Sequence, residues 1–203
     1  MGSATDPDLP VVILGSGSPS RLALLRRAGL DPKVVVSGVD ESALPGESPS
    51  QLTMRLAQAK ASVVAASITD GVVIGCDSLL ELDGVGYGKP GSPEPALELW
   101  QLMAGRSATF RTGHCVIDAG SGQQASALCS TAVTFVKPSM QEIAAYVRSG
   151  EPLSVAGAFK IDHKGGWFVE RIEGEPSNLQ GLSLPLLRRL LEELGISITQ
   201  LWT

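Results

Sequence analysis

Residues 11–21 of this 203-residue chain read VVILGSGSPSR. The four apolar residues predict a buried strand, the small residues after them a tight turn, and Pro19 the first position of a helix. The first turn of a helix has free N–H groups, and its dipole favours an anion there. Ser16 and Ser18 add hydroxyl donors, and Arg21 adds a planar, fixed positive charge. We therefore predict a phosphate site at this turn.

Two other interpretations of the turn stay open at this stage. Gly15 and Gly17 follow a strand, and Asp40 follows the next strand, as in a dinucleotide-binding fingerprint. The third glycine of that fingerprint is absent, because Ser20 holds its place. The second alternative is an ordinary strand-to-helix turn without a ligand.

The bulk composition restricts the partners of the chain. Hydrophobic residues make up 43% and charged residues 18%, which is typical of a globular protein. The net charge of −5 and an aromatic content of only 4% argue against nucleic-acid binding. No apolar run approaches the length of a membrane span, and the acidic N-terminus does not resemble a signal peptide. We expect neither nucleic acid nor a membrane as a partner.

The three cysteines and two histidines are scattered along the sequence. Cys76, Cys115 and Cys129 are an odd number without close spacing, so they predict neither a disulfide framework nor a zinc knuckle. Buried thiols in a reducing compartment are the better interpretation, and we expect a cytoplasmic location. His114 and His163 are far from each other, which argues against a histidine-based metal site.

Periodicity and capping signals predict an α/β protein. We expect residues 1–10 to be disordered and residues 11–203 to form a single domain, with two lobes of a mixed β-sheet, flanking helices and a cleft between them. Ser48 with Gln51, and Ser139 with Glu142, predict capping boxes at two helix starts. The predicted strands cover 11–14, 34–36 (buried), 72–82, 109–136 with turns at 113 and 120–122, and 166–172. The predicted helices cover 21–28, 93–104, 140–149 and 185–194, and a further helix begins at Pro49 and includes Val63.

Acidic side chains follow two of the predicted strands. Asp77, with Ser78 beside it, comes directly after Val72-Val73-Ile74, and Asp40-Glu41 follows residues 34–36. A carboxylate at the end of a central strand in an α/β fold lies where ligands usually bind. The alternatives are a cap or turn role for Asp77 and a solvated loop for Asp40-Glu41.

Two lysines stand in distinctive surroundings. Lys60 lies beside an expected apolar helix stripe of Leu52, Leu56, Ala59 and Val63, among small neighbours that would let it reach into a cleft. Lys89 stands between Gly88 and Pro90, which restrict its backbone. The alternatives are a surface lysine with a buried stem and an ordinary loop lysine.

Together, these carboxylates and cations suit a magnesium triphosphate. Carboxylates hold a hard divalent cation, and Arg21, Lys60 and Lys89 would neutralise phosphate oxygens. No Ser-His-Asp arrangement is indicated by the sequence around the two histidines.

At these residues the sequence resembles the Maf family of nucleoside triphosphate pyrophosphatases, from Val11 onward. The resemblance rests on several separated motifs in the family's order. They are Ser16-Gly17-Ser18-Pro19-Ser20-Arg21, Val39-Asp40-Glu41, Leu56-Ala57-Gln58-Ala59-Lys60-Ala61, Asp77-Ser78, Gly88-Lys89-Pro90, and a closing signature of residues 168–174, Ser177-Asn178 and Gly181-Leu182.

The resemblance implies hydrolysis of a nucleoside triphosphate to the monophosphate and pyrophosphate with a divalent metal, Mg²⁺ or Mn²⁺. It implies house-cleaning of standard, non-standard or modified nucleotides, a link to cell division, and an ability to form homodimers. We expect Asp77 to act as general base, directly or through a metal-bound water, and Glu41 with Asp77 to hold the metal. Ser16, Ser18, Arg21, Lys60 and Lys89 are expected to bind the phosphates.

The chain departs from the family pattern at positions that the resemblance connects with substrate choice. Ser20 replaces an arginine, Ser78 replaces a threonine, and Lys160-Ile161-Asp162 matches neither the thymidine/uridine nor the 7-methylguanosine triphosphate branch. An ionised Asp162 accepts hydrogen bonds only, so it should favour a base edge with N–H donors, such as guanine, with uracil as an alternative.

A different class of function is a nucleotide-binding regulator of cell division without turnover. Such a regulator needs the phosphate cradle but no reactive carboxylate. The presence of Asp77 together with Glu41 and Lys89 therefore favours the enzyme.

Overall fold

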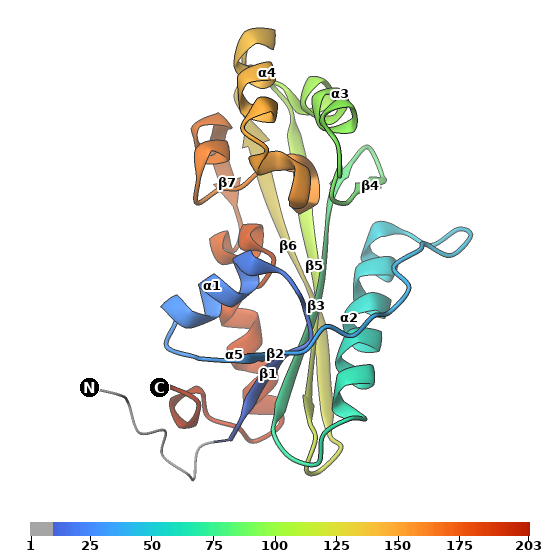
Figure 1. The fold of residues 1–203 in the computed structure, drawn as a ribbon, viewed down its shortest axis with the longest axis vertical. Coiled ribbons are helices and arrows are strands. Elements are labelled where there is room, and N and C mark those ends of the chain that lie inside the picture. The colour runs from blue at the N-terminus through green and yellow to red at the C-terminus, as the bar shows by residue number, and fades with distance from the viewer. Residues whose placement is uncertain (1–9) are drawn as a thin grey trace.

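One mixed sheet runs along the length of the molecule, with helices against both of its faces (Figure 1). The computed structural model describes residues 10–203, so the disorder expected for residues 1–10 falls, apart from Pro10, outside the described residues. The strands are β1 (Val12–Leu14), β2 (Lys33–Val34), β3 (Val72–Leu82), β4 (Val85–Tyr87), β5 (Ser107–Asp118), β6 (Gln124–Phe135) and β7 (Val169–Glu173). The predicted α/β class with a mixed sheet and flanking helices is confirmed.

The strand order is β2-β1-β3-β5-β6-β7, and β4 pairs with β3 outside this series. β1 runs parallel to both β2 and β3, whereas the other pairs are antiparallel. The helices are α1 (Pro19–Arg27), α2 (Pro49–Ala65), α3 (Pro93–Met103), α4 (Met140–Arg148) and α5 (Leu184–Glu193). No helix within the described residues combines the length and the apolarity that a membrane crossing requires.

The two halves of the molecule have separate cores on shared strands. In one half, α1 and α5 cover one face of the sheet and α2 covers the other; in the other half, α3 and α4 pack on the far end (Figure 1). The side chains of β3 alternate between the two faces of the sheet: Ile74 and Cys76 join the α1–α5 core on one face, and Val73 joins the α2 core on the other. Further along the strand, Leu80 joins the core of the other half. The predicted lobes are thus two ends of one continuous sheet.

The edge of β3 has a gap between its two partners. β1 pairs with Val72–Ile74, β4 pairs with Leu80–Leu82, and β5 occupies the opposite edge. The chain leaves the sheet after Leu14, where Gly15 donates a last hydrogen bond to the Ile74 carbonyl at 2.8 Å. Asp77 and Ser78 therefore lie on the stretch of β3 that has no strand beside it on this edge.

Helix starts follow the capping chemistry of the sequence. Both predicted capping boxes are confirmed, at Ser48 for α2 and Ser139 for α4. Ser18 is the N-cap of α1 and Ser183 is the N-cap of α5, each accepting from a backbone N–H three residues further on.

Four local predictions were wrong. Residues 34–36 are exposed, and β2 ends at Val34 because it is a short edge strand. Gly113 lies within β5 rather than at a turn, and residues 164–168 form a 3-10 helix before β7. The buried stripe of α2 is rotated from the expected one: Val63 is 50% exposed, while Lys60 lies on the buried face itself.

Candidate active site

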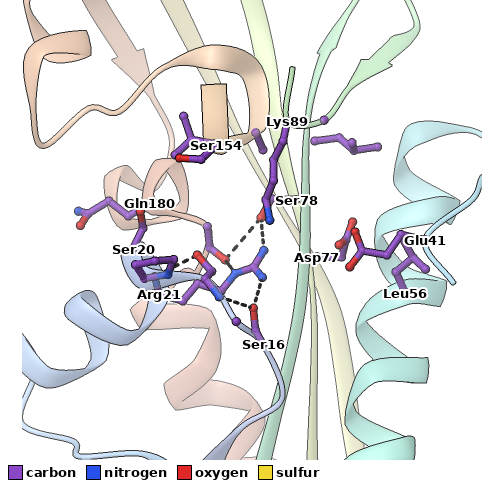
Figure 2. A pocket seen from close by; sticks show the side chains of 18 of the residues that line it. Ser16, Ser20, Arg21, Glu41, Leu56, Asp77, Ser78, Lys89, Ser154 and Gln180 are labelled. Atoms are coloured by element: carbon purple, nitrogen blue, oxygen red, sulfur yellow. Dashed lines mark hydrogen bonds between the residues drawn. The ribbon is translucent and has the colours of Figure 1, made fainter. Parts of the chain in front are cut away.

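A cavity of about 590 Å³ opens at the gap in the β3 edge. All ten residues that the sequence singled out line it, although they are spread over about 150 positions of the chain. They are Ser16, Ser18, Ser20, Arg21, Glu41, Lys60, Asp77, Ser78, Lys89 and Asp162. Figure 2 shows Arg21 and Ser16 facing one flank of β3, with Asp77 and Glu41 on the other flank.

Arg21 is held in the floor of the cavity and is only 7% exposed. Its guanidinium donates to the Gly181 carbonyl at 2.7 Å, to Ser16 Oγ at 2.8 Å and to Ser78 Oγ at 2.8 Å. No carboxylate within residues 10–203 forms an ion pair with it. Its charge is therefore not compensated by an ion pair, which is the arrangement that suits an anionic ligand.

The first loop lies beside this arginine. The α1 N-terminus lies at the cavity, and Ser16, Ser18 and Ser20 all line it. Ser18 Oγ also caps the helix by accepting from the Arg21 N–H at 3.4 Å. The positive end of the helix dipole and a buried arginine therefore lie at the same cavity.

Asp77 projects from the opposite face of β3, because neighbouring strand residues alternate. Its Oδ1 accepts from Lys60 Nζ at 2.6 Å, and Glu41 Oε1 lies 2.6 Å from the same nitrogen. Figure 2 shows the Asp77 and Glu41 carboxylates pointing toward one another between β3 and α2. Lys60 thus draws together two carboxylates that are 36 positions apart in the chain.

The two carboxylates have different environments. Burial raises the pKa of Asp77 above its usual value, with the positive charge of Lys60 opposing the shift. Partial burial acts to raise the pKa of Glu41, but the hydrogen bond to Lys60 and the positive charges of Lys60, Lys89 and Arg21 together lower it. Glu41 is therefore the more firmly ionised of the pair.

Close packing of α2 on the sheet brings Lys60 to Asp77. A Cβ atom on Gly75 would lie 2.4 Å from the Ala57 carbonyl, and one on Gly113 would lie 2.2 Å from the Thr53 carbonyl. Both glycines are on the face of β3 and β5 that carries Asp77. Only residues without a side chain allow the backbone of α2 to come so near.

Lys89 and Asp162 approach the cavity from the far half of the molecule. The Lys89 loop is fixed by a hydrogen bond from the Gly157 N–H to the Gly88 carbonyl at 3.1 Å. The side chain of Asp162 is 18% exposed and lies 3.6 Å from Arg27 and 3.1 Å from His163 Nδ1. The cavity is therefore lined from both halves.

Sequence reasoning missed several residues of the site. Arg27, which lies outside the motifs quoted from the sequence, contacts Asp162 and hydrogen-bonds Gln180, a lining residue. The Gly181 carbonyl belongs to a motif that was noted, but a backbone acceptor for Arg21 has no residue-type signal. Asp40, in contrast, is exposed and accepts hydrogen bonds from the Ser42 N–H and hydroxyl. It does not line the cavity.

Comparison with known proteins agrees with this geometry. Residues 11–194 match the family described as Maf-like protein. A protein of Streptomyces avermitilis named nucleoside triphosphate pyrophosphatase is 54% identical over 201 residues, covering 98% of each chain. A protein of the same name from Streptomyces coelicolor is 55% identical over 193 residues, covering 94% of each chain.

The fold also has a distant structural relative. The structure of the Staphylococcus aureus Ham1 protein aligns with a TM-score of 0.50 and 16% identity, covering 90% of this chain and 98% of that one. This likeness concerns the architecture alone. Because the family match and the Streptomyces relatives extend over nearly the whole sequence, the chain belongs to the Maf-like protein family.

Proposed function

We propose that this protein hydrolyses nucleoside triphosphates to the monophosphate and pyrophosphate. One observation carries the proposal: a buried arginine without a carboxylate partner, Arg21, shares a cavity with the converging carboxylates of Asp77 and Glu41. The cation binds a polyanion, and the carboxylates supply the chemistry beside it. The printed name of the Streptomyces relatives supports the same activity.

The triphosphate occupies the β1–α1 side of the cavity. Arg21 and the helix N–H groups bind phosphate oxygens, with Ser16 and Ser18 as further donors. Lys60 and Lys89 approach from α2 and from the far half, and they neutralise charge that moves onto the leaving pyrophosphate.

Asp77 serves as the general base for the water that attacks the α-phosphorus. Burial raises its pKa toward the working pH, which makes it a better proton acceptor than an ordinary carboxylate. Lys60 keeps Asp77 oriented by its 2.6 Å contact. The bond to the β-phosphate oxygen then breaks, and pyrophosphate leaves.

The residues also fit a divalent metal. Asp77 Oδ1 and Glu41 Oε1 converge on Lys60 Nζ, so a divalent cation would bind the remaining oxygens of the two carboxylates. Between residues 10 and 203 no cluster of three or more His, Cys, Asp or Glu residues is present to hold it without substrate phosphates. Mg²⁺ is commonly bound through one or two carboxylates together with substrate phosphates, so Asp77 and Glu41 are a fitting pair. When bound, the metal, Mg²⁺ or Mn²⁺, supplies charge neutralisation at the phosphates.

Substrate choice is proposed to depend on Ser20, Ser78 and Asp162. Asp162 is the base-reading residue in this proposal, and Ser20 lies at the phosphate side. Ser78 contributes indirectly, since its hydroxyl accepts from Arg21 and contacts Thr112 Oγ1 at 3.0 Å. House-cleaning of modified nucleotides, a role in cell division, a cytoplasmic location and a homodimer remain predictions.

The direct test is to incubate the protein with a panel of triphosphates and Mg²⁺ and to assay pyrophosphate. We expect release with at least one nucleotide, and Asp77→Asn should lower kcat by about 10²–10⁴-fold while nucleotide binding persists. Binding without any turnover across the panel would favour the regulator instead.

Asp83→Asn is the matched control. Asp83 follows β3 and bonds the exposed Arg106, so the same amide replacement leaves the cavity untouched. It also has a positive φ of 53°, which asparagine tolerates. Equal activity loss in the two variants would remove Asp77 from its role.

A further inference from the structure

His114 is a buried polar residue that does not line the cavity. It lies on β5 and is fully buried. Its Nε2 is 2.8 Å from the Ser183 backbone N–H, and its Nδ1 is 3.1 Å from the Thr112 carbonyl. Because a backbone N–H only donates and a carbonyl only accepts, Nε2 is the acceptor and Nδ1 carries the proton. The ring is thus held as one neutral tautomer.

The two segments that His114 joins are those that hold Arg21. Ser183 ends the turn that begins at Gly181, whose carbonyl accepts from Arg21 Nε at 2.7 Å. Thr112, on the other side, contacts Ser78 Oγ at 3.0 Å, and Ser78 Oγ accepts from Arg21 at 2.8 Å. Ser78 is already held by its pairing with Thr112 across β3 and β5, so the Gly181 carbonyl is the Arg21 acceptor whose position depends on the imidazole.

The position of the turn depends on such an anchor. Gly181 has a φ of +91°, and a Cβ atom there would lie 3.1 Å from Arg21 Nε, so the backbone passes very close to the guanidinium. Ser183 is the N-cap of α5, and its N–H lies before the helix ladder, where it needs an outside acceptor. His114 supplies that acceptor from the sheet.

We propose that His114 is a positioning residue: its Nε2 fixes the Gly181–Ser183 turn against β5, which keeps Arg21 aimed into the phosphate site. The expected effect of His114 on catalysis rests on the proposed function, whereas its expected effect on anion binding rests on geometry alone. The competing interpretation is that His114 only stabilises the core.

The test compares replacements of His114 that distinguish the loss of its hydrogen-bond acceptor from the loss of its side-chain volume. His114→Leu removes the acceptor, His114→Asn keeps a donor toward Thr112 but is too short to reach Ser183, and His114→Gln can place Oε1 near the Nε2 position. We expect His114→Leu and His114→Asn to lower kcat/KM by about 10–100-fold, since small displacements of a binding group have effects of this size. His114→Gln should recover most of the loss.

A double-mutant cycle with Arg21→Lys distinguishes positioning from stability. If His114 acts through Arg21, the His114 replacements should change kcat/KM by less than about threefold once Arg21 is lysine. Equal losses in both backgrounds would overturn the proposal, as would wild-type kcat/KM in a less stable His114→Leu protein. If neither His114→Leu nor His114→Asn folds, the residue serves the fold and the proposal is also overturned.

A binding measurement tests the positioning role of His114 independently of the proposed function. The dissociation constant of inorganic pyrophosphate, measured by calorimetry on the same variants, needs no turnover. A wild type that binds pyrophosphate but hydrolyses no triphosphate would defeat the proposed function only. Weaker pyrophosphate binding in His114→Leu, restored in His114→Gln, would then still support the positioning role, whereas unchanged binding would refute it.

Discussion

At the scale of single residues, the site depends on charges whose neighbours are chosen by the fold. Arg21 is surrounded by neutral acceptors, and its charge is left for a ligand. Lys60 is shared between Asp77 and Glu41, so one cation orients two acids. These environments, rather than the residue types, distinguish the charged side chains of the cavity from the surface ion pairs of the same protein.

Asp162 gives a prediction about substrate preference. Partial burial acts to raise the pKa of Asp162, but the hydrogen bond with His163 and the positive charges of His163 and Lys160 together lower it, so the side chain only accepts hydrogen bonds at neutral pH. Asp162→Gln should reduce the preference for guanine over other bases by about tenfold, the value of one hydrogen bond to a charged group. The measurement is kcat/KM across the nucleotide panel.

Asp31→Asn is the control for this variant, because Asp31 pairs with the exposed Arg26 and neither residue lines the cavity. An unaltered ranking of the triphosphates in Asp162→Gln would mean that this side chain does not contact the base.

His114 gives a prediction about acid stability. Burial lowers its pKa from 6.5 to about 4, so the folded protein keeps the ring neutral while the unfolded chain takes up a proton below pH 6.5. The associated stability is fully present above pH 6.5 and declines as the pH falls toward 4. Between pH 7 and pH 4.5 this amounts to about 2 kcal/mol.

Urea unfolding of the wild type and His114→Gln at the two pH values isolates that contribution. Carboxylates titrate in both proteins, so the difference in unfolding free energy between the variants should change by about 2 kcal/mol with pH. A difference that is independent of pH would show that His114 does not titrate as its burial requires.

At the scale of elements, the approach of α2 to the sheet decides the catalytic geometry. The helix contributes Lys60, the strand contributes Asp77, and two glycines remove the side chains that would separate them. The three-residue β1 matters equally, because its early end leaves the edge of β3 open at Asp77 and Ser78.

Gly75→Ala tests this packing. The new Cβ would meet the Ala57 carbonyl at 2.4 Å and the Ala61 nitrogen at 2.7 Å, so α2 must shift. We expect a loss of about 1–3 kcal/mol in unfolding free energy, as for other overpacked sites. Activity should fall as well, because Lys60 moves with the helix. Chemical denaturation and pyrophosphate release measure the two effects.

Gly120→Ala is the corresponding control, since Gly120 lies in the β5–β6 turn and a Cβ atom there would meet only the side-chain oxygens of Asp70 at 3.3 Å and Asp118 at 3.5 Å. Stability of Gly75→Ala equal to that of this control would contradict the close packing of α2.

At the scale of the whole molecule, the cavity joins two separately packed halves. Arg21 and Lys60 come from the half with α1, α2 and α5, whereas Lys89 and Asp162 come from the half with α3 and α4 (Figure 1). A polyanion in the cavity offsets repulsion among cations from both halves. Its binding should therefore stabilise the molecule as a unit.

Thermal unfolding of Asp77→Asn with a triphosphate tests this coupling without consumption of the ligand. At a concentration of 100 times Kd, binding adds about 2.7 kcal/mol, which raises Tm by roughly 5–10 °C for a chain of this size. Omission of Mg²⁺ should reduce the shift if Glu41 helps to hold the metal. An unchanged Tm with every triphosphate would contradict a nucleotide site in the cavity.

The sequence by itself determined what local physical chemistry can encode. Serine caps determined the starts of α2 and α4, with Pro49 in the first turn of α2. Apolar runs marked β1 and β3, and the turn at residues 15–21 was identified from its chemistry. It also supplied the residue types of the site and their order in the family motifs. Its errors were local as well. The exposed valines of residues 34–36 were predicted to form a buried strand, because an edge strand this short has no periodic pattern that would show its exposure. Gly113 was predicted to lie at a turn, because no periodic pattern in the sequence marks the close contact of α2 with this position.

Only the tertiary structure decided how those residues meet. Pairing across the sheet placed Gly113 opposite Asp77, the gap in the β3 edge opened the cavity, and the turn before α5 brought a backbone carbonyl to Arg21. Such contacts join positions up to 160 residues apart, and a backbone acceptor or an empty space has no side chain of its own to mark it in the sequence. Residue identity therefore indicates the chemistry, whereas burial and distance, which assign each charge its partner, arise only when the chain packs.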